Sequence, residues 1–533
     1  SAIEIRGNNT LTADNINLTG NSTNGTGIDL QGTNTLNATN GSISLTGNST
    51  NGTGLQLSNG TNTLNATNGS ISLTGNSTNG TGLFLGGNKT LSASNGSINL
   101  TGSSTSGVGL YLGERNSTNA FTATNGSINL NGVSVAKSAI EIRGNNTLTA
   151  DNINLTGNST NGTGIDLQGT NTLTATSGNI SLNGTAQSRW DGVRIQGRSN
   201  ITATNGSISL TGHSDANIGV SLSGSSSWDA TNITITGSSS WNGSTASEDV
   251  YVGRGIQLDG NLTFTGNVAI NGTGEGGSGV ALRALVNLTF NNGTAVINGT
   301  STGHSVNDIY TAGIGLHSYI GETDITNIIL NNSNLTMNGH SQNAAGIGGW
   351  SDSDTKTKWN ISGNGNVTIN GSSVEMDGFR TISINATGLN GSVALFGKST
   401  NGSGVKITKT EMSNVTISGS ATGNGSGVDI SGDNTLTNTT VSGNGTDGAG
   451  VSISGNLSNS GNSTVTGNAS GNGTGVDING TVTGGDITGN ASGNGNGVNI
   501  SGNITDGVIS GSATGNGAGV DISGDSTLIN TTV

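Results

Sequence analysis

The chain has 533 residues, including 95 glycines, no proline and no cysteine, and only 9% of its residues are charged. Without cysteine there is no disulfide framework, no thiolate metal site and no thiol nucleophile. The formal charge is −14, and the few basic residues are scattered, so the chain lacks the positive surface that binds nucleic acid or anionic membranes. We therefore expect neither nucleic-acid binding nor membrane insertion.

The sequence repeats itself along its length. Residues 1–36 recur unchanged at 138–173, and residues 418–441 return with three changes at 510–533. A hydrophobic content of 29% is low enough for disorder. In a repeat array, however, neighbouring units share one continuous core, so a low apolar fraction is sufficient.

A short cassette marks each repeat, with one apolar residue on each side of a middle residue. The first run extends from residues 3–5 to residues 220–222 at a spacing of about 25 to 30 residues, which is typical of a solenoid. The last run extends from residues 405–407 to residues 520–522 at about 22 to 25. About twenty cassettes can be counted in the whole chain.

Each repeat contains short segments in which apolar and polar residues alternate, as they do in half-buried strands. In the repeat at residues 28–54 these segments are residues 28–30, 35–38 and 43–45. Asn40-Gly41 and Asn51-Gly52 follow them, and such dipeptides favour positive φ at turns. No helical period is present. The absence of proline is consistent with parallel strand ladders, because these use nearly every backbone N–H and proline has none. We expect an all-β solenoid, a right-handed parallel β-helix with three short strands per coil and about twenty coils.

The regularity of the repeats divides the chain into three parts. Residues 1–223 form regular β-helix repeats, residues 224–380 form irregular coils from which loops project, and residues 381–533 form regular repeats with shorter coils. The middle part contains four of the five tryptophans, Trp228, Trp241, Trp350 and Trp359.

Loops on a rigid scaffold commonly carry recognition, with exposed Trp and Tyr as anchors. The segments 304–310 and 350–359 are the expected loops, and Tyr310, Trp350 and Trp359 are their candidate ligand contacts. The alternative is that these aromatic side chains cap or cover the edge of the solenoid.

The middle residues of the cassettes are expected to form one outward row. Glu141 and Asp166 would then lie on adjacent coils beside Arg194, and two carboxylates about 5 Å apart can divide acid and nucleophile roles in glycoside hydrolysis. Parallel β-helices are also the scaffold of many polysaccharide lyases and hydrolases. We prefer the interpretation of a polar stripe with a cross-strand ion pair, because Glu4 and Asp29 form the same pair without an arginine.

Phe84 and Tyr111 are neighbours on the same row and are candidate ligand contacts. They could form a platform for a sugar ring, or a stacked pair that only stabilises the sheet.

Metal and cofactor chemistry has little support in the sequence. The four histidines, His213, His304, His317 and His340, show no i, i+4 spacing, which argues against zinc. Gly/Asp stretches such as residues 423–429 recur about every 22 residues, whereas the calcium-binding repeat recurs every nine. No nucleophile elbow or phosphate loop is present. We expect no metal and no cofactor.

The strongest chemical signal is Asn-x-Ser/Thr. The sequence contains 54 such sequons among 78 asparagines, where a Ser and Thr content of about 28% would give about 22 by chance. Asn-Gly turns followed by Ser or Thr generate some of them without any glycosylation. Asn17, Asn37, Asn65, Asn99 and Asn154, however, lie where the alternation points them outward from strands. The candidate glycosylation sites are Asn17, Asn21, Asn24, Asn37, Asn40, Asn48, Asn51, Asn65, Asn68, Asn76, Asn79, Asn99, Asn154, Asn158 and Asn161.

Coils such as NNTLTADNINLTGNSTNGTG and TLNATNGSISLTGNSTNGTG resemble the repeat region of exoproteins secreted by the two-partner route. These are the filamentous-haemagglutinin and high-molecular-weight adhesins, including EtpA-like glycosylated members. The resemblance covers the whole chain and rests on repeat style. It implies an extracellular or bacterial cell-surface adhesin that is exported through an outer-membrane transporter, modified by a cytoplasmic glycosyltransferase of the glucosyl type, and bound to a host-cell receptor or glycan.

The secretion domain of that family is not recognisable here, and the chain opens at Ser1 and stops at Val533 inside repeats, as a segment of a longer protein would. Our leading hypothesis is a non-enzymatic β-helical stalk of an adhesin. The alternative is a polysaccharide-active enzyme that uses Glu141 and Asp166. Ice binding would require a regular Thr-x-Thr face, which the cassettes do not offer.

Overall fold

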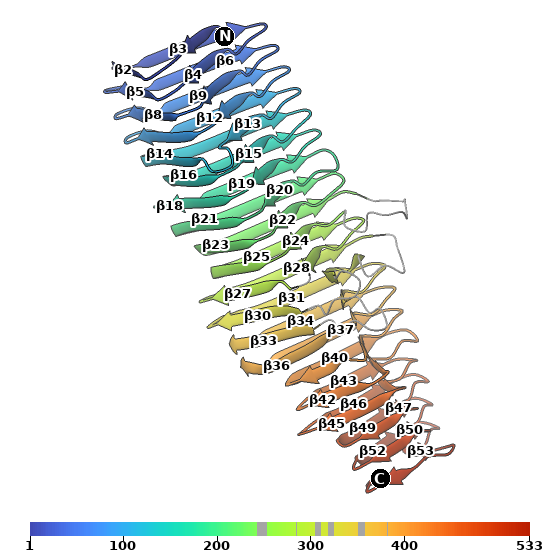
Figure 1. Cartoon of the computed structure of the whole chain (residues 1–533). Helices are drawn as coiled ribbons and strands as arrows, with labels where there is room; N and C mark the ends of the chain where they lie inside the picture. The colour runs from blue at the N-terminus through green and yellow to red at the C-terminus, as the bar shows by residue number, and fades with distance from the viewer. Residues whose placement is uncertain (242–252, 284, 304–310, 318–324, 350–357, 381) are drawn as a thin grey trace. The chain divides into compact units, whose positions relative to one another are not determined.

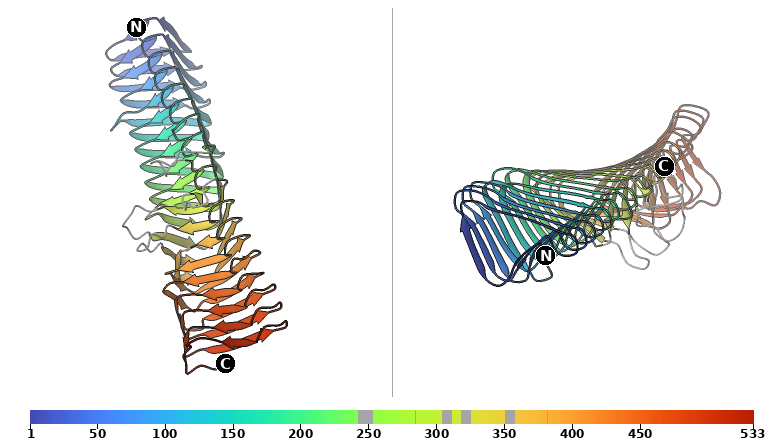
Figure 2. Two further views of the ribbon diagram at one scale, coloured as in Figure 1. Left: turned by 90° about the vertical axis from the view of Figure 1, so that its right-hand side faces the viewer. Right: turned by 90° about the horizontal axis from the view of Figure 1, so that it is seen from above.

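Figure 1 shows the computed structural model of the chain, which describes residues 1–241, 253–283, 285–303, 311–317, 325–349, 358–380 and 382–533. The described residues form strands and turns without an α-helix, and successive coils pair as parallel strands (Figure 2). The right-handed parallel β-helix expected from the sequence is confirmed.

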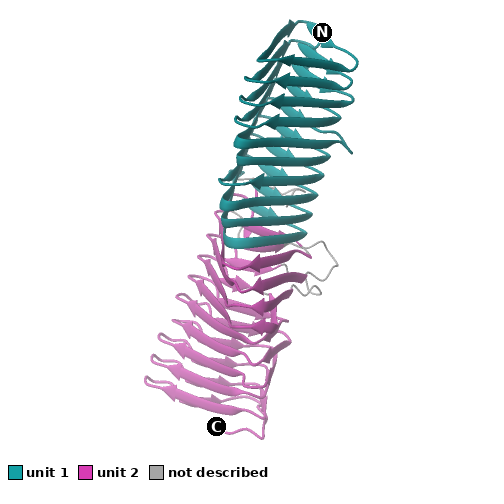
Figure 3. Cartoon of the chain, turned by 90° about the vertical axis from the view of Figure 1, so that its left-hand side faces the viewer, with its two compact units in different colours: residues 1–241, 255–270 teal, residues 242–254, 271–533 magenta. Residues whose placement is uncertain are grey.

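The chain divides into two compact units (Figure 3). Unit 1 contains residues 1–241 and 255–270, and unit 2 contains residues 242–254 and 271–533. The division by regularity at residues 223 and 380 stays a prediction.

The cassettes of unit 1 form ten short strands that pair in parallel from coil to coil, here called the cassette sheet. They are β1 (Ile3–Ile5), β4 (Ile28–Gln31), β7 (Leu55–Ser58), β10 (Leu83–Leu85), β13 (Leu110–Leu112), β15 (Ile140–Ile142), β17 (Ile165–Leu167), β20 (Val193–Ile195), β22 (Val220–Leu222) and β24 (Ile256–Leu258).

The remaining strands of unit 1 belong to a second sheet, here called the long sheet. They are β2 (Asn9–Ala13), β3 (Ile16–Ser22), β5 (Asn34–Ala38), β6 (Ile43–Ser49), β8 (Thr61–Ala66), β9 (Ile71–Ser77), β11 (Asn88–Ala93), β12 (Ile98–Ser104), β14 (Thr118–Ser134), β16 (Asn145–Ser159), β18 (Thr170–Ala175), β19 (Ile180–Ala186), β21 (Arg198–Ser214), β23 (Ser225–Ser239) and β25 (Asn261–Gly274). In β14, β16, β21, β23 and β25 the second and third segments of a coil are one continuous strand.

In its described residues, unit 2 repeats this organisation with ten cassette strands, so the described coils of the two units match the expected number of about twenty. The strands are β26 (Val280–Arg283), β29 (Ile314–His317), β32 (Ile347–Gly349), β35 (Phe379–Arg380), β38 (Val405–Thr408), β41 (Val428–Ser431), β44 (Val451–Ile453), β47 (Val476–Ile478), β50 (Val498–Ile500) and β53 (Val520–Ile522).

Its long-sheet strands are β27 (Asn287–Asn291), β28 (Thr294–Ser301), β30 (Ile325–Asn331), β31 (Asn334–Ser341), β33 (Lys358–Asn364), β34 (Val367–Ser373), β36 (Ser383–Asn390), β37 (Val393–Ser399), β39 (Glu411–Ser413), β40 (Val415–Ala421), β42 (Asn434–Thr437), β43 (Thr440–Gly445), β45 (Asn456–Ser460), β46 (Thr464–Ala469), β48 (Thr481–Thr483), β49 (Asp486–Ala491), β51 (Asn503–Thr505), β52 (Val508–Ala513) and β54 (Leu528–Ile529).

The expected alternation holds within a coil. In β5 the side chains of Leu36 and Ala38 are buried, and in β6 those of Ile43 and Leu45 are buried, while the residues between them are partly exposed. Each coil therefore contributes a few apolar side chains to an interior that it shares with its neighbours.

The positive φ predicted for Asn40-Gly41 and Asn51-Gly52 is wrong. The left-handed backbone lies instead just after the cassette strands, at Gly32 (φ +88°) and at the dipeptide Asn59-Gly60 (φ +46° and +77°). Gly41 and Gly52 are needed for another reason, the close approach of the preceding coil. A Cβ on Gly41 would lie 2.1 Å from Asn15 Oδ1, and one on Gly52 would lie 2.5 Å from the carbonyl oxygen of Gly25.

In each unit, glycines form a row in the third segments of the coils. In unit 1, a Cβ on Gly75 would lie 2.1 Å from the carbonyl oxygen of Gly82, which precedes the cassette strand β10. The same clash recurs between Gly47 and Gly54 at 2.1 Å and, in unit 2, between Gly339 and Gly346 at 2.2 Å. At this margin of the coil, here called the glycine edge, the two sheets approach so closely that no side chain fits between the backbones.

A buried polar row runs beside the apolar core of unit 1, at the start of the second segments. Asn34 Nδ2 donates to Asn62 Oδ1 in the next coil at 3.1 Å, and Asn119 Nδ2 donates to Asn146 Oδ1 at 2.9 Å. Stacked amides of this kind satisfy one another from coil to coil. The register of the sheet places Lys89 between Asn62 and Asn119.

Lys89 interrupts this row. Its Nζ donates to the carbonyl oxygens of Gly86 and Asn88, and Asn62 Nδ2 is left without a hydrogen-bond partner. Burial lowers the pKa of Lys89 to about 8, although the carboxylate of Glu114 acts in the opposite direction. The row is therefore weakest at this coil.

Gly75→Ala is expected to lower the unfolding free energy by about 1–3 kcal/mol, because the methyl group overlaps the Gly82 carbonyl. Urea unfolding followed by circular dichroism measures it. The control is Thr74→Ala, whose side chain is partly exposed on the other face of the strand. A loss no larger for Gly75→Ala than for the control would contradict the close contact.

Lys89→Asn is expected to stabilise the protein at pH 7, because it completes the amide row. In the native chain, folding lowers the pKa of Lys89 from 10.5 to about 8. Between these pH values the unfolded state binds more protons than the folded state, so the stability of the native chain rises with pH from about 8 to 10.5. The difference between native and variant melting temperatures should therefore shrink across this window. A pH-independent difference would contradict the assignment.

Candidate functional site

The middle residues of the cassettes form one row in unit 1, as the sequence predicts. Strand registers pair each with the next, and the row reads Glu4, Asp29, Gln56, Phe84, Tyr111, Glu141, Asp166, Arg194 and Ser221. Several of these outward side chains are nevertheless covered by long neighbours. Glu141 is 8% exposed and Asp166 is 2% exposed.

Both candidate catalytic carboxylates are engaged by other side chains. Glu141 forms an ion pair with Arg143, two residues further along the same coil. Asp166 receives Arg194 Nη2 at 2.6 Å and Arg194 Nε at 3.1 Å, and Gln168 Nε2 donates to it at 2.7 Å. A bidentate arginine and an amide therefore hold Asp166 in one orientation.

The electrostatics of this cluster are set mainly by burial. Burial raises the pKa of Glu141, with Arg143 opposing and Asp166 reinforcing the shift. Burial also raises the pKa of Asp191, to about 6, although the charge of Arg194 lowers it. Burial lowers the pKa of Arg194, but its hydrogen bond to Asp166 and the surrounding carboxylates raise it overall. The cluster resembles an internal ion-pair network more than an open acid and nucleophile pair.

Phe84 and Tyr111 form a stacked pair on the same row. Their ring centroids are 5.3 Å apart and the ring planes are inclined by 27°. The guanidinium carbon of Arg143 lies 5.6 Å from the Tyr111 centroid. The tyrosine ring therefore contacts both an aromatic ring and a cation, an arrangement that stabilises the sheet. Both rings remain partly exposed.

Several candidate glycosylation sites fall into outward rows of asparagines. Asn48 Nδ2 donates to Asn21 Oδ1 at 2.7 Å, and Asn76 Nδ2 donates to Asn48 Oδ1 at 2.9 Å. Asn65 Nδ2 donates to Asn37 Oδ1 at 3.0 Å. The other contacts within rows of candidates are Asn51 to Asn24, Asn79 to Asn51, and Asn154 and Asn99 through Asn129.

These contacts give the asparagines a structural role that does not depend on sugar. An amide that donates within its row uses one Nδ2 hydrogen there, and the second remains available. Asn17, Asn40, Asn68, Asn158 and Asn161 are exposed, whereas Asn37, Asn65, Asn99 and Asn154 are half-buried. The exposed set, together with Asn21, Asn24, Asn51, Asn76 and Asn79, is the more accessible to a modifying enzyme.

Two tryptophans of the middle part do not reach the surface. Trp228 and Trp359 are fully buried, because each occupies an inward position of a long-sheet strand. The prediction that Trp359 contacts a ligand is therefore wrong, and so is the alternative that it covers the edge of the solenoid. Tyr310, Trp350, residues 304–310 and residues 350–357 lie outside the described residues.

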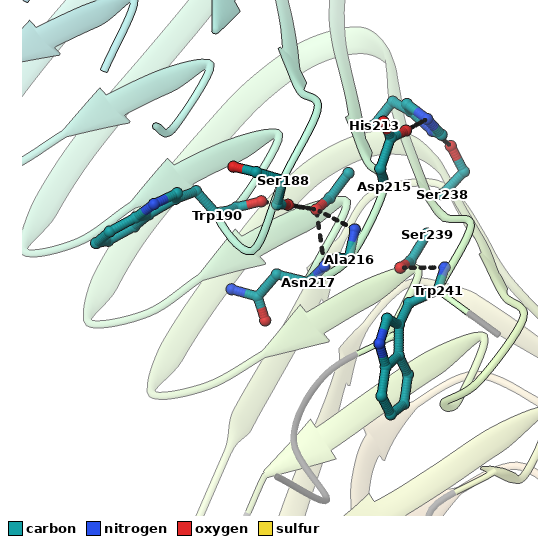
Figure 4. A network of polar contacts seen from close by, with 10 residues as sticks. Ser188, Trp190, His213, Asp215, Ala216, Asn217, Ser238, Ser239 and Trp241 are labelled. Carbon is teal, nitrogen blue, oxygen red and sulfur yellow. Dashed lines mark hydrogen bonds and ion pairs between the residues drawn. The ribbon is translucent and has the colours of Figure 1, made fainter. Parts of the chain in front are cut away.

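Trp190, which the sequence analysis did not single out, is exposed. It lies in the turn between β19 and β20 with 49% of its surface accessible. Figure 4 shows its indole extending away from a hydrogen-bonded network that holds the turn. Ser214 Oγ donates to the Trp190 carbonyl oxygen at 2.6 Å and accepts from the Asn217 amide at 2.9 Å. The sequence signal was this turn, which reads Ser-Arg-Trp-Asp at residues 188–191, where other coils read Thr-Asn-Gly-Thr.

A histidine joins the neighbouring coil in the same region (Figure 4). His213 Nδ1 lies 2.8 Å from Ser238 Oγ, and Nε2 lies 3.0 Å from Asp215 Oδ1. Within the part of the chain that the structure describes, no three His, Asp or Glu side chains are arranged to hold a metal ion. His304 and the side chain of His317 lie outside that part.

No family model matches the sequence, and no curated protein matches it significantly. Within the described residues, no helix has the length and apolar character needed to span a bilayer.

Asp191→Asn is expected to stabilise the protein by about 1–3 kcal/mol at neutral pH. The raised pKa of Asp191, about 6, means that the folded state keeps its proton longer than the unfolded state. Its stabilising contribution is therefore complete below about pH 4 and is lost as the pH rises through 6.

Thermal unfolding between pH 4 and 8 tests this expectation. The native chain should lose stability across the interval relative to Asp191→Asn, while Asp486→Asn, at an exposed carboxylate, should follow the native profile. Parallel profiles for all three proteins would show that Asp191 titrates as an ordinary surface carboxyl.

Proposed function

We propose that this chain is part of a secreted or surface-exposed bacterial adhesin, in which a β-helical stalk displays contact residues to a host or other cell surface. The observation that carries the proposal is the outer surface of the coils. It consists of stacked amide and hydroxyl rows with little charge, from which single aromatic side chains such as Trp190 are exposed. Exposed aromatic residues on a rigid scaffold are typical anchors for a partner.

Catalysis is less well supported than display. A glycoside hydrolase needs one carboxyl that reaches the glycosidic oxygen and another that reaches the sugar or a water. Glu141 and Asp166 are buried and paired with arginines. The raised pKa of Glu141 keeps a polysaccharide-active enzyme as the second candidate. Polysaccharide cleavage that disappears in Glu141→Gln would establish it in place of the adhesin.

The stacking of coils also suits export as an unfolded chain. Within each unit, successive described coils pair through parallel ladders, so each emerging coil finds a template in the last one. Folding on the outer side would then oppose back-sliding through an outer-membrane transporter. The absence of cysteine means that no disulfide has to form or be broken on the way.

The proposal includes N-glycosylation at some sequons by a glycosyltransferase. The free second hydrogen of each exposed amide permits a glycosidic bond without loss of the contact in the row. A pyranose ring is, however, wider than the strand spacing of about 4.8 Å. Sugars on consecutive members of one row, such as Asn24, Asn51 and Asn79, would collide.

Glycopeptide mapping of protein from its native host should therefore find hexose-sized additions on exposed sequons, with low joint occupancy at neighbours in a row. Molecules carrying sugar on both Asn51 and Asn79 should be rare compared with the product of the two single occupancies. An unmodified intact mass would remove the glycosylation part of the proposal, and full occupancy of a row would contradict the spacing argument.

The adhesin itself is tested by location and binding. An epitope tag in the turn at Asn51-Gly52 should be accessible to antibody on intact cells or in the medium, and the purified chain should bind host cells saturably. Trp190→Ala should weaken that binding more than Val133→Ala, which also removes an exposed apolar side chain. A cytoplasmic location would overturn the proposal.

A further inference from the structure

The repeat pattern of unit 2 breaks at one coil of its long sheet. Two outward rows flank the glycine row here, and strand registers define both. The first row reads Asn298, Asn338, Asn370, Phe396, Ser418, Ser442, Thr466, Thr488 and Ser510. The second reads Thr300, His340, Ser372, Lys398, Ser420, Asn444, Asn468, Asn490 and Ser512.

Phe396 is the one apolar member of the first row, and Lys398 is the one lysine or arginine of the second. Both belong to β37, on either side of Gly397. Phe396 is 45% exposed. A single exposed ring has no special meaning alone, but a ring and a cation that replace two polar residues of the repeat on one strand mark a local specialisation.

The two rows enclose a groove of about 580 Å³, within the range of about 300–1,000 Å³ that small-ligand sites occupy. Asn338, His340, Asn370, Ser372, Phe396 and Lys398 line it, and the glycines between the rows form its floor. Because glycine has no side chain, the backbone of the sheet itself is accessible there.

Polar groups with free capacity surround the ring. Asn338 Nδ2 donates to Asn298 Oδ1 at 2.8 Å, and Asn370 Nδ2 donates to Asn338 Oδ1 at 2.7 Å. The row of side-chain amides stops at Phe396, so no amide of the next coil donates to the side-chain Oδ1 of Asn370. Each side-chain amide of the row also retains a second N–H. His340 Nδ1 contacts Ser372 Oγ at 2.9 Å.

Lys398 completes the groove as an exposed cation that forms no ion pair with the residues that the structure describes. In a chain whose net charge is −14, an unpaired cation beside an exposed ring selects for an anionic ligand.

We propose that this groove binds an acidic saccharide, a pyranose that carries a carboxylate. The apolar C–H face of the sugar packs on the Phe396 ring, as hydrophobic ligand faces pack on aromatic side chains. Hydroxyl groups bond to the amides of Asn338 and Asn370, and the carboxylate forms a charge-assisted hydrogen bond with Lys398. This inference deepens the proposed adhesin function, since it names the surface and the ligand class of attachment.

The full chain is titrated with 3′-sialyllactose and with a glucuronic acid disaccharide, and lactose serves as the neutral probe, with binding followed by saturation-transfer NMR and calorimetry. At least one acidic probe should bind saturably and more tightly than lactose, and the preferred probe distinguishes sialic from uronic acids.

Two variants locate the binding. Phe396→Ala should lower affinity about tenfold through loss of the stacking surface, and Lys398→Gln should remove most of the preference for the acidic probe over lactose. Val133→Ala and Lys137→Gln make similar changes at exposed positions of unit 1. They should leave the affinity and the preference for the acidic probe unchanged.

Absence of saturable binding to either acidic probe would overturn the inference, and so would saccharide binding that Phe396→Ala leaves intact. A protein partner that carries no sugar and whose binding depends on Phe396 would also overturn it. Cell binding is scored separately. Cells that still bind Phe396→Ala would contradict the groove but leave the adhesin, and a cytoplasmic location would contradict the adhesin even where the sugar binds.

Discussion

The contact between backbones at the glycine edge is the constraint on which the rest of this structure depends. A Cβ at Gly47, Gly75 or Gly339 would lie 2.1–2.2 Å from a carbonyl oxygen just before the facing cassette strand, which is closer than two non-bonded atoms can approach. The two sheets of a coil therefore converge to backbone thickness at one side, and the interior can accept only a few apolar side chains per coil. The high glycine content and the low hydrophobic content both follow from this geometry. They are therefore not a sign of disorder.

Stacking then determines which polar residues are used. Side chains in register lie one strand spacing apart, so a charged residue would face its own kind in each coil, whereas asparagine donates and accepts at once. Rows such as Asn34 to Asn62 inside and Asn21 to Asn76 outside satisfy themselves in this way. Part of the excess of sequons is thus a by-product of amide rows and Asn-Gly turns, and the exposed amides are the part that sugar attachment could use.

The sequence predicted those features that repeat. The alternation of cassettes and long segments established the strands, the parallel stacking and the order of the row from Glu4 to Ser221, because each apolar residue has an equivalent in every coil. Prediction from the sequence failed at positions where a single coil departs from the repeat. The repeat did not indicate that the Trp359 side chain is buried. The dipeptide Asn40-Gly41 predicted a positive φ, whereas glycine is required at Gly41 because the preceding coil lies too close for a Cβ. Lys89 and Phe396 are visible only as breaks in a row, and a row is known only once the register is known. Trp190 lies in a turn whose sequence departs from that of the other coils.

Register between coils is accordingly the claim to test most directly. Ser72 and Ser209 occupy one outward row of unit 1, connected by five successive pairings. The chain has no cysteine, so Ser72→Cys and Ser209→Cys would carry the only two spin labels. Double electron–electron resonance should give one narrow distance distribution near 24 Å, five steps of about 4.8 Å. A broad distribution, or one centred well beyond 35 Å, which is about seven such steps, would contradict the stacked parallel coils.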